Sequence, residues 1–301
     1  MNVVIQVSDK TKEKMMEYYK DKKRDKEIPY VVFQAEDMDT VITMYTSGKV
    51  MFQGVSADVD AAMWKEMDGQ SVTSTTKDSD RKYYDCSSIG SDEVGTGDYF
   101  GPIVVTASFV KKEDIVFLEN LGIRDSKKIN DDTILKIAPQ IAKRIQYKSI
   151  ILNNSEYNEK HAQDHNMNKI KAIMHNKVLF ELVQEVKDSY DYIVVDEFAK
   201  EKRYYDYIKE AMGIQHGITF MTKAEDKNLA VACSSIISRY LFIKEFDKLA
   251  DSLHVPLPKG AGPQVDKIGE EIVEKYGKDK LKEVAKLNFA NTARILKTVI
   301  F

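Results

Sequence analysis

Cysteine is scarce in this sequence, and its placement suggests neither a disulfide framework nor a structural metal centre. The 301 residues contain two cysteines, Cys86 and Cys233, which lie far apart and lack the close spacing of zinc-binding pairs. Disulfide-dense frameworks belong mostly to secreted domains. We therefore expect a chain that folds in a reducing compartment, and the cytoplasm fits.

Long hydrophobic runs are also missing. No stretch reaches the roughly 20 apolar residues that a helix needs to cross a bilayer. Residues 1–10 lack the basic start and apolar core of a secretory signal peptide. We expect no association with a membrane.

A strong excess of charge is absent as well, since the formal net charge is −3. If the chain binds a polyanion, local lysine patches or metal ions must offset the negative charges. Hydrophobic residues make up 43% and charged residues 31%, which is ordinary for a globular protein. The length favours one large domain and a smaller one.

Residues 1–68 form the smaller domain, for which we predict an α+β fold. Strand-like patterns occupy residues 3–7, 30–34, 40–45 and 50–53, and residues 46–49 contain Gly48 and suit a hairpin turn. Helix-compatible segments cover residues 11–23 and 58–67, and the second carries the single tryptophan, Trp64. Residues 69–85 are rich in Ser, Thr and charge at the start and are predicted to be a linker.

Residues 86–301 alternate between strand and helix patterns, which predicts an α/β domain with a mixed sheet. The part of the chain after Gly262 is mostly helical in pattern. Strands are predicted at residues 86–89, 102–110, 149–152, 192–195 and 217–221, and helices at residues 133–144, 167–187 and 228–249.

Acidic residues stand where three of these elements end or begin. Asp92 and Glu93 follow the first strand, Asp196 ends the run 192–195, and Asp226 precedes the helix at 228–249. Strand ends and helix starts share one rim of an α/β sheet. Clustered carboxylates are tolerated where divalent cations bind them, and oxygen ligands favour Mg²⁺ or Mn²⁺. Taken singly, such an aspartate is more often a turn or helix cap, so the pattern leaves both interpretations open.

Several longer motifs, taken together, resemble the type 2 ribonucleases H. Residues 90–102, GSDEVGTGDYFGP, resemble the opening motif of that family, with Thr96 in the place where ribonuclease HII has a basic residue, as in the HIII branch. Residues 194–196 resemble the strand of the third carboxylate, and residues 223–239 the segment of the fourth. Residues 124–128, RDSKK, resemble the Asp-Ser-Lys segment of the family.

The resemblance implies an RNase H-like catalytic domain with a helical C-terminal extension, which cuts the RNA strand of RNA–DNA hybrids. It implies that Asp92, Glu93, Asp196 and Asp226 bind the metal ions and carry out catalysis. The Gly95-Thr96-Gly97 loop would read the 2′-OH, which distinguishes RNA from DNA. The candidate phosphate contacts are Ser126, Lys127 and Lys128.

The smaller domain resembles the repeat of the TATA-box-binding protein, which the HIII branch adds to the HII fold. One face of its sheet would then bind nucleic acid, with Lys49, Tyr45 and Phe52 as candidates; a generic hairpin is the alternative. His161, His165 and His175 lie on or near a helix, where we expect solvent-facing or capping roles; a role of one of them in product release or proton transfer is the alternative.

Two other functions stay open at this point. One is an HII-like enzyme that also cuts at single ribonucleotides in DNA, and the other is a binding protein without catalysis. Ala261, in residues 258–262, stands where HII has a tyrosine that stacks at the RNA–DNA junction, which favours cutting within continuous hybrids. We expect a monomer.

Overall fold

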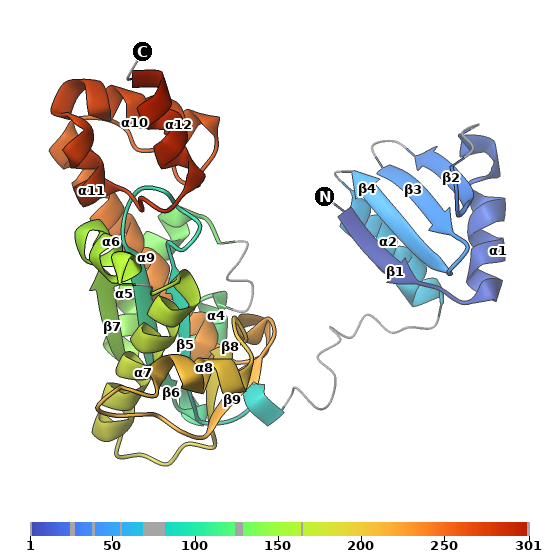
Figure 1. Cartoon of the computed structure of the whole chain (residues 1–301). Coiled ribbons are helices and arrows are strands. Elements are labelled where there is room, and N and C mark those ends of the chain that lie inside the picture. The colour runs from blue at the N-terminus through green and yellow to red at the C-terminus, as the bar shows by residue number, and fades with distance from the viewer. Residues whose placement is uncertain are drawn as a thin grey trace. The chain divides into compact units, whose positions relative to one another are not determined.

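The chain folds as two units, residues 1–77 and 78–301, each described here by itself (Figure 1). The computed structural model describes residues 2–24, 28–37, 40–54, 56–68, 82–123, 129–163 and 165–299. Most of the predicted linker, residues 69–81, therefore lies outside the described residues. Its last residues pack on the second unit, where the Tyr84 hydroxyl donates to a Glu119 oxygen at 2.9 Å.

The first unit contains a four-stranded antiparallel sheet with the strand order β1-β4-β3-β2. Strand β3 runs over the predicted residues, and the other strands agree with prediction to within a few residues. The strands are β1 (Asn2–Gln6), β2 (Val31–Asp37), β3 (Thr40–Tyr45) and β4 (Lys49–Gly54).

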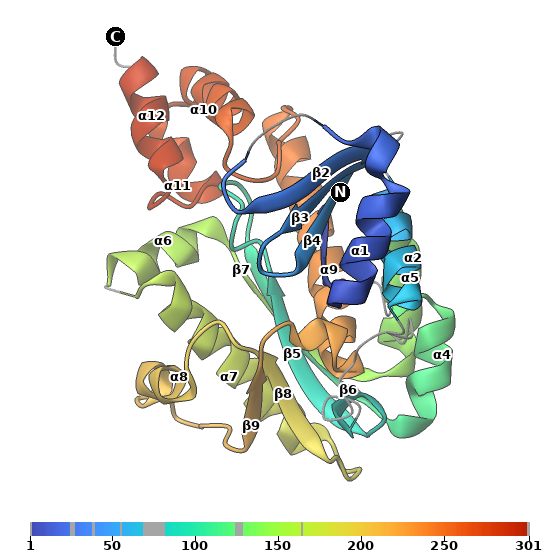
Figure 2. The ribbon, with the colours of Figure 1, turned by 90° about the vertical axis from the view of Figure 1, so that its right-hand side faces the viewer.

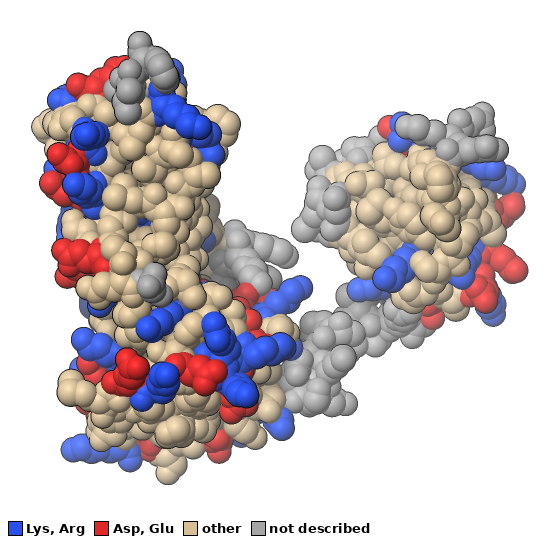
Figure 3. Space-filling model, in the orientation of Figure 1, with Lys and Arg blue, Asp and Glu red and all other residues tan. Residues whose placement is uncertain are grey.

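Two helices, α1 (Asp9–Tyr18) and α2 (Ala57–Met67), bury one face of this sheet. A short 3-10 helix, Lys20–Lys22, follows α1. Inside the core the Trp64 Nε1–H donates to the Tyr19 hydroxyl at 2.9 Å, so the buried indole has a partner. The opposite face of the sheet carries no described helix of this unit, and in Figure 3 the visible side of the unit is largely uncharged.

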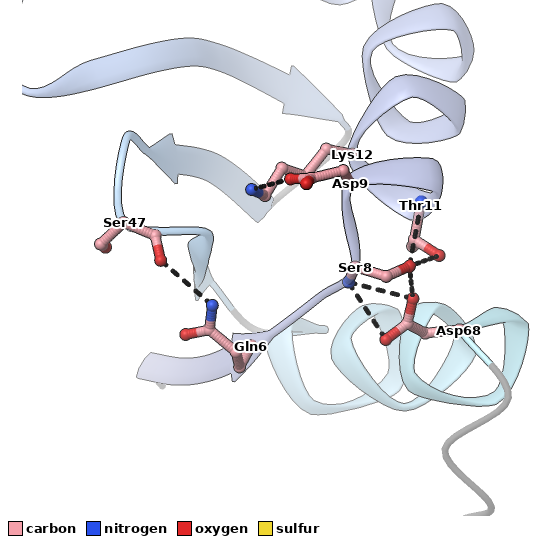
Figure 4. A network of polar contacts seen from close by, with 7 residues as sticks. All are labelled: Gln6, Ser8, Asp9, Thr11, Lys12, Ser47 and Asp68. Atoms are coloured by element: carbon pink, nitrogen blue, oxygen red, sulfur yellow. Dashed lines mark hydrogen bonds and ion pairs between the residues drawn. The ribbon is translucent and has the colours of Figure 1, made fainter.

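Polar contacts join the ends of the two helices (Figure 4). Ser8 is the N-cap of α1, and its hydroxyl accepts from the Thr11 N–H at 3.4 Å. Asp68, just after α2, accepts from the Ser8 hydroxyl at 2.5 Å and from the Ser8 N–H at 3.2 Å. These bonds hold the start of α1 against the end of α2.

The second unit is built on a five-stranded mixed sheet with the order β7-β6-β5-β8-β9. Strands β7, β6 and β5 pair antiparallel, whereas β5, β8 and β9 pair parallel. The predicted α/β class with a mixed sheet is confirmed. The strands are β5 (Ser88–Val94), β6 (Ile103–Val110), β7 (Gln146–Leu152), β8 (Tyr192–Asp196) and β9 (Ile218–Met221).

Helices cover both faces of this sheet (Figure 2). On one face lie α9 (Leu229–Leu253), α5 (Asp131–Arg144) and α4 (Ile115–Asn120), with a 3-10 helix, Lys112–Asp114, before α4. On the other face lie α7 (Met167–Glu185) and α8 (Glu201–Ile208). Both faces of β6 are therefore buried, which explains why apolar residues occupy both faces of this strand.

The C-terminal extension is helical, as predicted. It consists of α10 (Pro263–Tyr276), α11 (Leu281–Val284) and α12 (Ala290–Val299), with a 3-10 helix, Lys278–Lys280. Its core continues into the far end of α9 through Phe242 and Phe246, and α6 (Asn154–Ala162) contacts α11. The extension therefore packs against the sheet and helix α9 of the second unit.

Candidate active site

Two neighbouring parallel strands bring the predicted carboxylates together. Asp92 and Glu93 lie near the carboxyl end of β5, inside the strand, which is longer than predicted. Asp196 is the last residue of β8, and Ser91 pairs with Val195 in the register between the two strands. The parallel direction of β5 and β8 therefore puts these carboxylates at one edge of the sheet.

A pocket of about 240 Å³ opens at this edge, and the carboxylate that joins Asp92 and Asp196 there is Glu225. The predicted fourth carboxylate, Asp226, is exposed and does not line this pocket. Both residues lie on the 3-10 helix Ala224–Asp226, where adjacent side chains point in different directions. The other lining residues are Ile134, Ser235, Ile236 and Arg239.

The pKa values of two pocket carboxylates are raised, in part because the negative charges repel one another. Burial raises the pKa of Asp92 well above its ordinary value, and the charge of Glu93 raises it further. Burial also raises the pKa of Asp196, although the Ala224 N–H donates to its Oδ1 at 3.0 Å; the charges of Glu225 and Glu93 add to this rise. A divalent cation would relieve this repulsion.

Glu93 differs from its neighbours because two basic side chains hold it. The Lys171 Nζ lies 2.5 Å from Oε1, and the His175 Nε2 lies 2.9 Å from Oε2. Burial alone would raise the pKa of Glu93, but its bonds to His175 and Lys171 lower it to about 2. Lys171 was not among the predicted site residues, and His175, for which a solvent-facing or capping role was preferred to one in proton transfer, is fully buried. The available signal in the sequence was their spacing of one helical turn on α7, which puts both side chains on the same face of the helix.

Buried hydroxyls fasten helix α9 to the strands behind the pocket. The Ser234 hydroxyl lies 2.9 Å from the Gly90 carbonyl oxygen, and the Ser238 hydroxyl 2.9 Å from Thr106 Oγ1. Gly90 allows this close approach, since a Cβ there would lie 2.4 Å from the Val231 backbone nitrogen. The Ser-Ser-Ile-Ile-Ser run thus sets the distance between α9 and β5.

The predicted glycine loop follows β5 directly. Gly95 has a φ of +94°, and a Cβ on it would lie 2.2 Å from the Pro102 carbonyl oxygen, so the fold itself requires glycine here. Gly97 is exposed with open space around its Cα, and Thr96 between them is partly exposed. Only the Gly97 position therefore leaves room for a ligand to approach the backbone closely.

Other parts of the chain hold this loop. The Gly260 N–H donates to Asp98 Oδ1 at 2.6 Å, and the Tyr99 N–H donates to the Gly260 carbonyl at 2.9 Å. The buried Lys286 Nζ donates to the carbonyls of Asp98 and Gly101 at 2.8 and 2.6 Å. The loop that contains Ala261 thus lies directly beside the glycine loop.

The predicted phosphate contacts Ser126, Lys127 and Lys128 lie outside the described residues. In the first unit Lys49 is exposed and Tyr45 lies on the open face of the sheet, since their neighbours Val50 and Met44 point into the core. Phe52 is fully buried in that core, so its prediction as a nucleic-acid contact is wrong.

The pocket has the donor chemistry for Mg²⁺ or Mn²⁺, because its charged ligands are carboxylate oxygens. No group of three or more His, Cys, Asp or Glu side chains in the described parts of the chain is arranged to hold an ion as it stands. Glu93 keeps both oxygens on Lys171 and His175. No helix among the described residues is long and apolar enough to cross a membrane.

Comparison with known proteins agrees with this architecture. The family model "Ribonuclease HII" matches residues 89–292, and a domain of unknown function, DUF3378, matches residues 2–77. Ribonuclease HIII of Bacillus cereus (strain ATCC 10987 / NRS 248) is 39% identical over 302 residues, which cover 97% of each chain. The chain belongs to the ribonuclease HIII group of the ribonuclease HII family. Ribonuclease HIII of Bacillus anthracis is 38% identical, again over 97% of each chain.

Solved structures of ribonucleases HIII and H3 have the same fold. The crystal structure of Bst-RNase HIII in complex with Mn²⁺ superposes with a TM-score of 0.74 at 36% identity and covers 99% of both chains. Aquifex aeolicus RNase H3 superposes with a TM-score of 0.55 at 22% identity, over 95% of this chain and 99% of that one. The predicted membership in the ribonuclease HIII branch is confirmed.

Proposed function

We propose that this chain cuts the RNA strand of RNA–DNA hybrids by hydrolysis, with Mg²⁺ or Mn²⁺ bound at the carboxylate pocket. The observation that carries the proposal is the convergence of Asp92, Asp196 and Glu225 on one pocket at the ends of β5 and β8. Family membership supplies the reaction class.

When bound, a divalent cation at these carboxylates would supply Lewis-acid chemistry, which lowers the pKa of water and stabilises a leaving oxygen. The chain's own residues orient that chemistry. Asp92 and Asp196 are held at fixed strand positions, and the Ala224 N–H fixes one oxygen of Asp196. Glu225 adds a third carboxylate to the pocket lining from the 3-10 helix Ala224–Asp226, just before α9. We assign these residues and Glu93 to metal binding and catalysis.

Recognition of the RNA strand is assigned to the glycine loop. Gly97 leaves its backbone open to a ligand, and the neighbouring Thr96 hydroxyl can donate and accept. Such groups suit a 2′-OH, which also donates and accepts. Ser126, Lys127 and Lys128 stay predicted phosphate contacts.

The open sheet face of the first unit is assigned to hybrid binding. The face carries Lys49 and Tyr45, and no described helix of the first unit packs on it. A lysine attracts the phosphate backbone, and a tyrosine ring offers a flat surface for a base or sugar. Both cysteines are buried free thiols, which fits a reducing compartment. We propose that the enzyme is cytoplasmic and monomeric.

The deciding experiment is cleavage of an end-labelled RNA–DNA hybrid in Mg²⁺ by the full chain and two neighbouring variants. Glu225→Gln is expected to reduce the rate by at least about a hundredfold, because it removes a pocket carboxylate. Asp226→Asn serves as the matched control and should stay within about threefold of wild type, because Asp226 is exposed beside the pocket.

If Asp226→Asn lost activity and Glu225→Gln kept it, the catalytic role would belong to Asp226 and not to Glu225. A wild-type chain that binds the hybrid without cutting it would favour the non-catalytic alternative.

Substrate choice follows from the loop at residues 258–262. Ala261 lies beside the glycine loop, and its carbonyl accepts from Asn291 Nδ2 at 3.0 Å. An alanine offers no aromatic face, so stacking at an RNA–DNA junction, about 1–3 kcal/mol per contact, is absent. We predict efficient cutting of a continuous hybrid and poor cutting beside a single ribonucleotide in duplex DNA. Equal rates on the two substrates in Mg²⁺ would favour HII-like specificity.

A further inference from the structure

A lysine and a histidine on one face of α7 occupy both oxygens of Glu93. Lys171 and His175 are one turn apart, and 8% and 0% of their surfaces are exposed. Lys171 Nζ contacts Oε1 at 2.5 Å, and His175 Nε2 contacts Oε2 at 2.9 Å. The other ring nitrogen of His175 lies 2.7 Å from the Ser91 hydroxyl.

Phe198 supports both basic side chains. Its ring stacks on the His175 ring with centroids 5.2 Å apart and an interplanar angle of 29°. The Lys171 Nζ lies 4.1 Å from the centre of the same ring, which is the geometry of a cation–π contact. Lys171 therefore cannot swing into solvent as a surface lysine can, and its charge stays beside the carboxylate.

The positive charge of Lys171 repels the divalent cation that the negatively charged pocket attracts. Asp92 and Asp196 each interact electrostatically with Glu93 and Glu225. A cation bound through Glu93 would lie close to the Lys171 ammonium, because that ammonium touches the same carboxylate. Repulsion between like charges at such short range, away from bulk water, outweighs the benefit of one hydrogen bond that orients the carboxylate.

We propose that Lys171 is a built-in counter-ion that limits the affinity of the carboxylate pocket for its divalent cation. The proposal rests on the proposed function, since it concerns the metal site of that reaction. Lys171 is a positioning residue: it acts through Glu93 and leaves the cation exchangeable, so that tight binding requires the substrate phosphate as well. A merely structural lysine would have the opposite effect, because its loss would disorder Glu93 and weaken cation binding.

The test measures binding of Mn²⁺ to the full chain without nucleic acid, by electron paramagnetic resonance of the free ion. Lys171→Met is expected to bind Mn²⁺ about tenfold more tightly, equal to ~1.4 kcal/mol. Lys171→Arg keeps the charge and should stay within about twofold of wild type. Lys177→Met removes an exposed charge from the same helix and should leave the affinity unchanged.

Mn²⁺ affinity that is unchanged or weaker in a folded Lys171→Met protein overturns the proposal. If that variant does not fold, as judged by circular dichroism, Lys171→Gln replaces it with the same expected direction. Asp92→Asn, measured in parallel, should lose Mn²⁺ binding; if it does not, the ion binds elsewhere and the proposal fails. Cleavage of the hybrid by the wild-type chain is read separately, so a failure of the counter-ion role is distinguishable from a failure of the proposed function.

Discussion

Asp196 is one of the residues that we expect to bind the metal ion, and its position in the fold leaves its side chain little freedom to move. It ends a buried strand, one oxygen accepts the Ala224 N–H, and its neighbours in the pocket are acidic. Its raised pKa reflects burial first and the charges of Glu225 and Glu93 next. A neutral isostere therefore keeps the hydrogen bond and the shape but removes the charge that a metal ion needs.

The Asp196→Asn variant should lose hybrid cleavage by at least about a thousandfold while it keeps the fold and most of the hybrid affinity. The measurements are single-turnover cleavage, a thermal melt and a filter-binding titration. Near-wild-type turnover would remove Asp196 from the catalytic set. A large loss of thermal stability would instead give the residue a structural role.

The protonation of Lys286 contributes to the stability of the fold. It is fully buried, and burial lowers its pKa from 10.5 to about 7, against the weaker opposite effect of Asp98. Between these two values the unfolded chain binds more protons than the folded chain at this position. The free energy of unfolding therefore gains a contribution that rises with pH above about 7.

We expect the free energy of unfolding of wild type, relative to Lys286→Met, to rise by up to about 1.4 kcal/mol per pH unit between about pH 7 and pH 9. Urea unfolding at several pH values in this window measures it. The comparison with the variant cancels the contributions of other groups, such as the cysteines. A difference that is flat or falls with pH would contradict the lowered pKa.

Among the elements, the contact between β5 and α9 decides where the carboxylates stand. Gly90 lets the helix backbone approach the strand, and a Cβ there would lie 2.4 Å from Val231 N and 2.8 Å from the Ala230 carbonyl carbon. These are backbone atoms, which cannot move aside as a flexible side chain can. The helix carries Ser235 and Arg239 to the pocket, and Glu225 just precedes it.

Gly90→Ala should destabilise the catalytic unit by about 1–3 kcal/mol, because the added methyl group pushes α9 away from the sheet. Gly97→Ala is the control within the same motif: its Cβ meets nothing within 4 Å, so its stability should equal that of wild type. Thermal melts of both variants test this. If Gly97→Ala also reduces hybrid cleavage without loss of stability, the loop contacts substrate as proposed.

At the scale of the whole molecule, the chain has two units with separate cores. The core of the first unit is formed by its own sheet and the two helices α1 and α2, and the second unit has its own sheet and helices. Removal of residues 1 to about 75 should therefore leave a folded catalytic unit.

The truncated chain should bind the hybrid more weakly than the full chain, because it lacks the open sheet face with Lys49. Circular dichroism checks its fold, and titration with labelled hybrid compares the two affinities. Equal affinity would show that the first unit is no substrate-binding module, and an unfolded truncated chain would refute the independence of the two cores.

The sequence by itself was sufficient for the strands, for the longest helices of the second unit and for the family, but it did not predict α4, α6 and α8. Strand-like patterns predicted the strands of both sheets, because side chains on a half-buried strand alternate between core and solvent and a strand buried on both faces is mostly apolar. The motif at residues 90–102 was specific enough to place Asp92 and Glu93 at the site. Residues 192–195 predicted a buried strand, and Asp196 at its end is where the structure has it.

Only the tertiary structure decided which acidic and basic side chains meet. Glu225 and Asp226 are adjacent in the sequence, and the turn of a 3-10 helix sends one into the pocket and leaves the other exposed. Lys171 and His175 lie on α7, which packs on the sheet face opposite to α9, and they are more than 70 residues from Glu93 in the sequence. Such contacts depend on how helices pack across a sheet, and local patterns carry no information about the partner on another element.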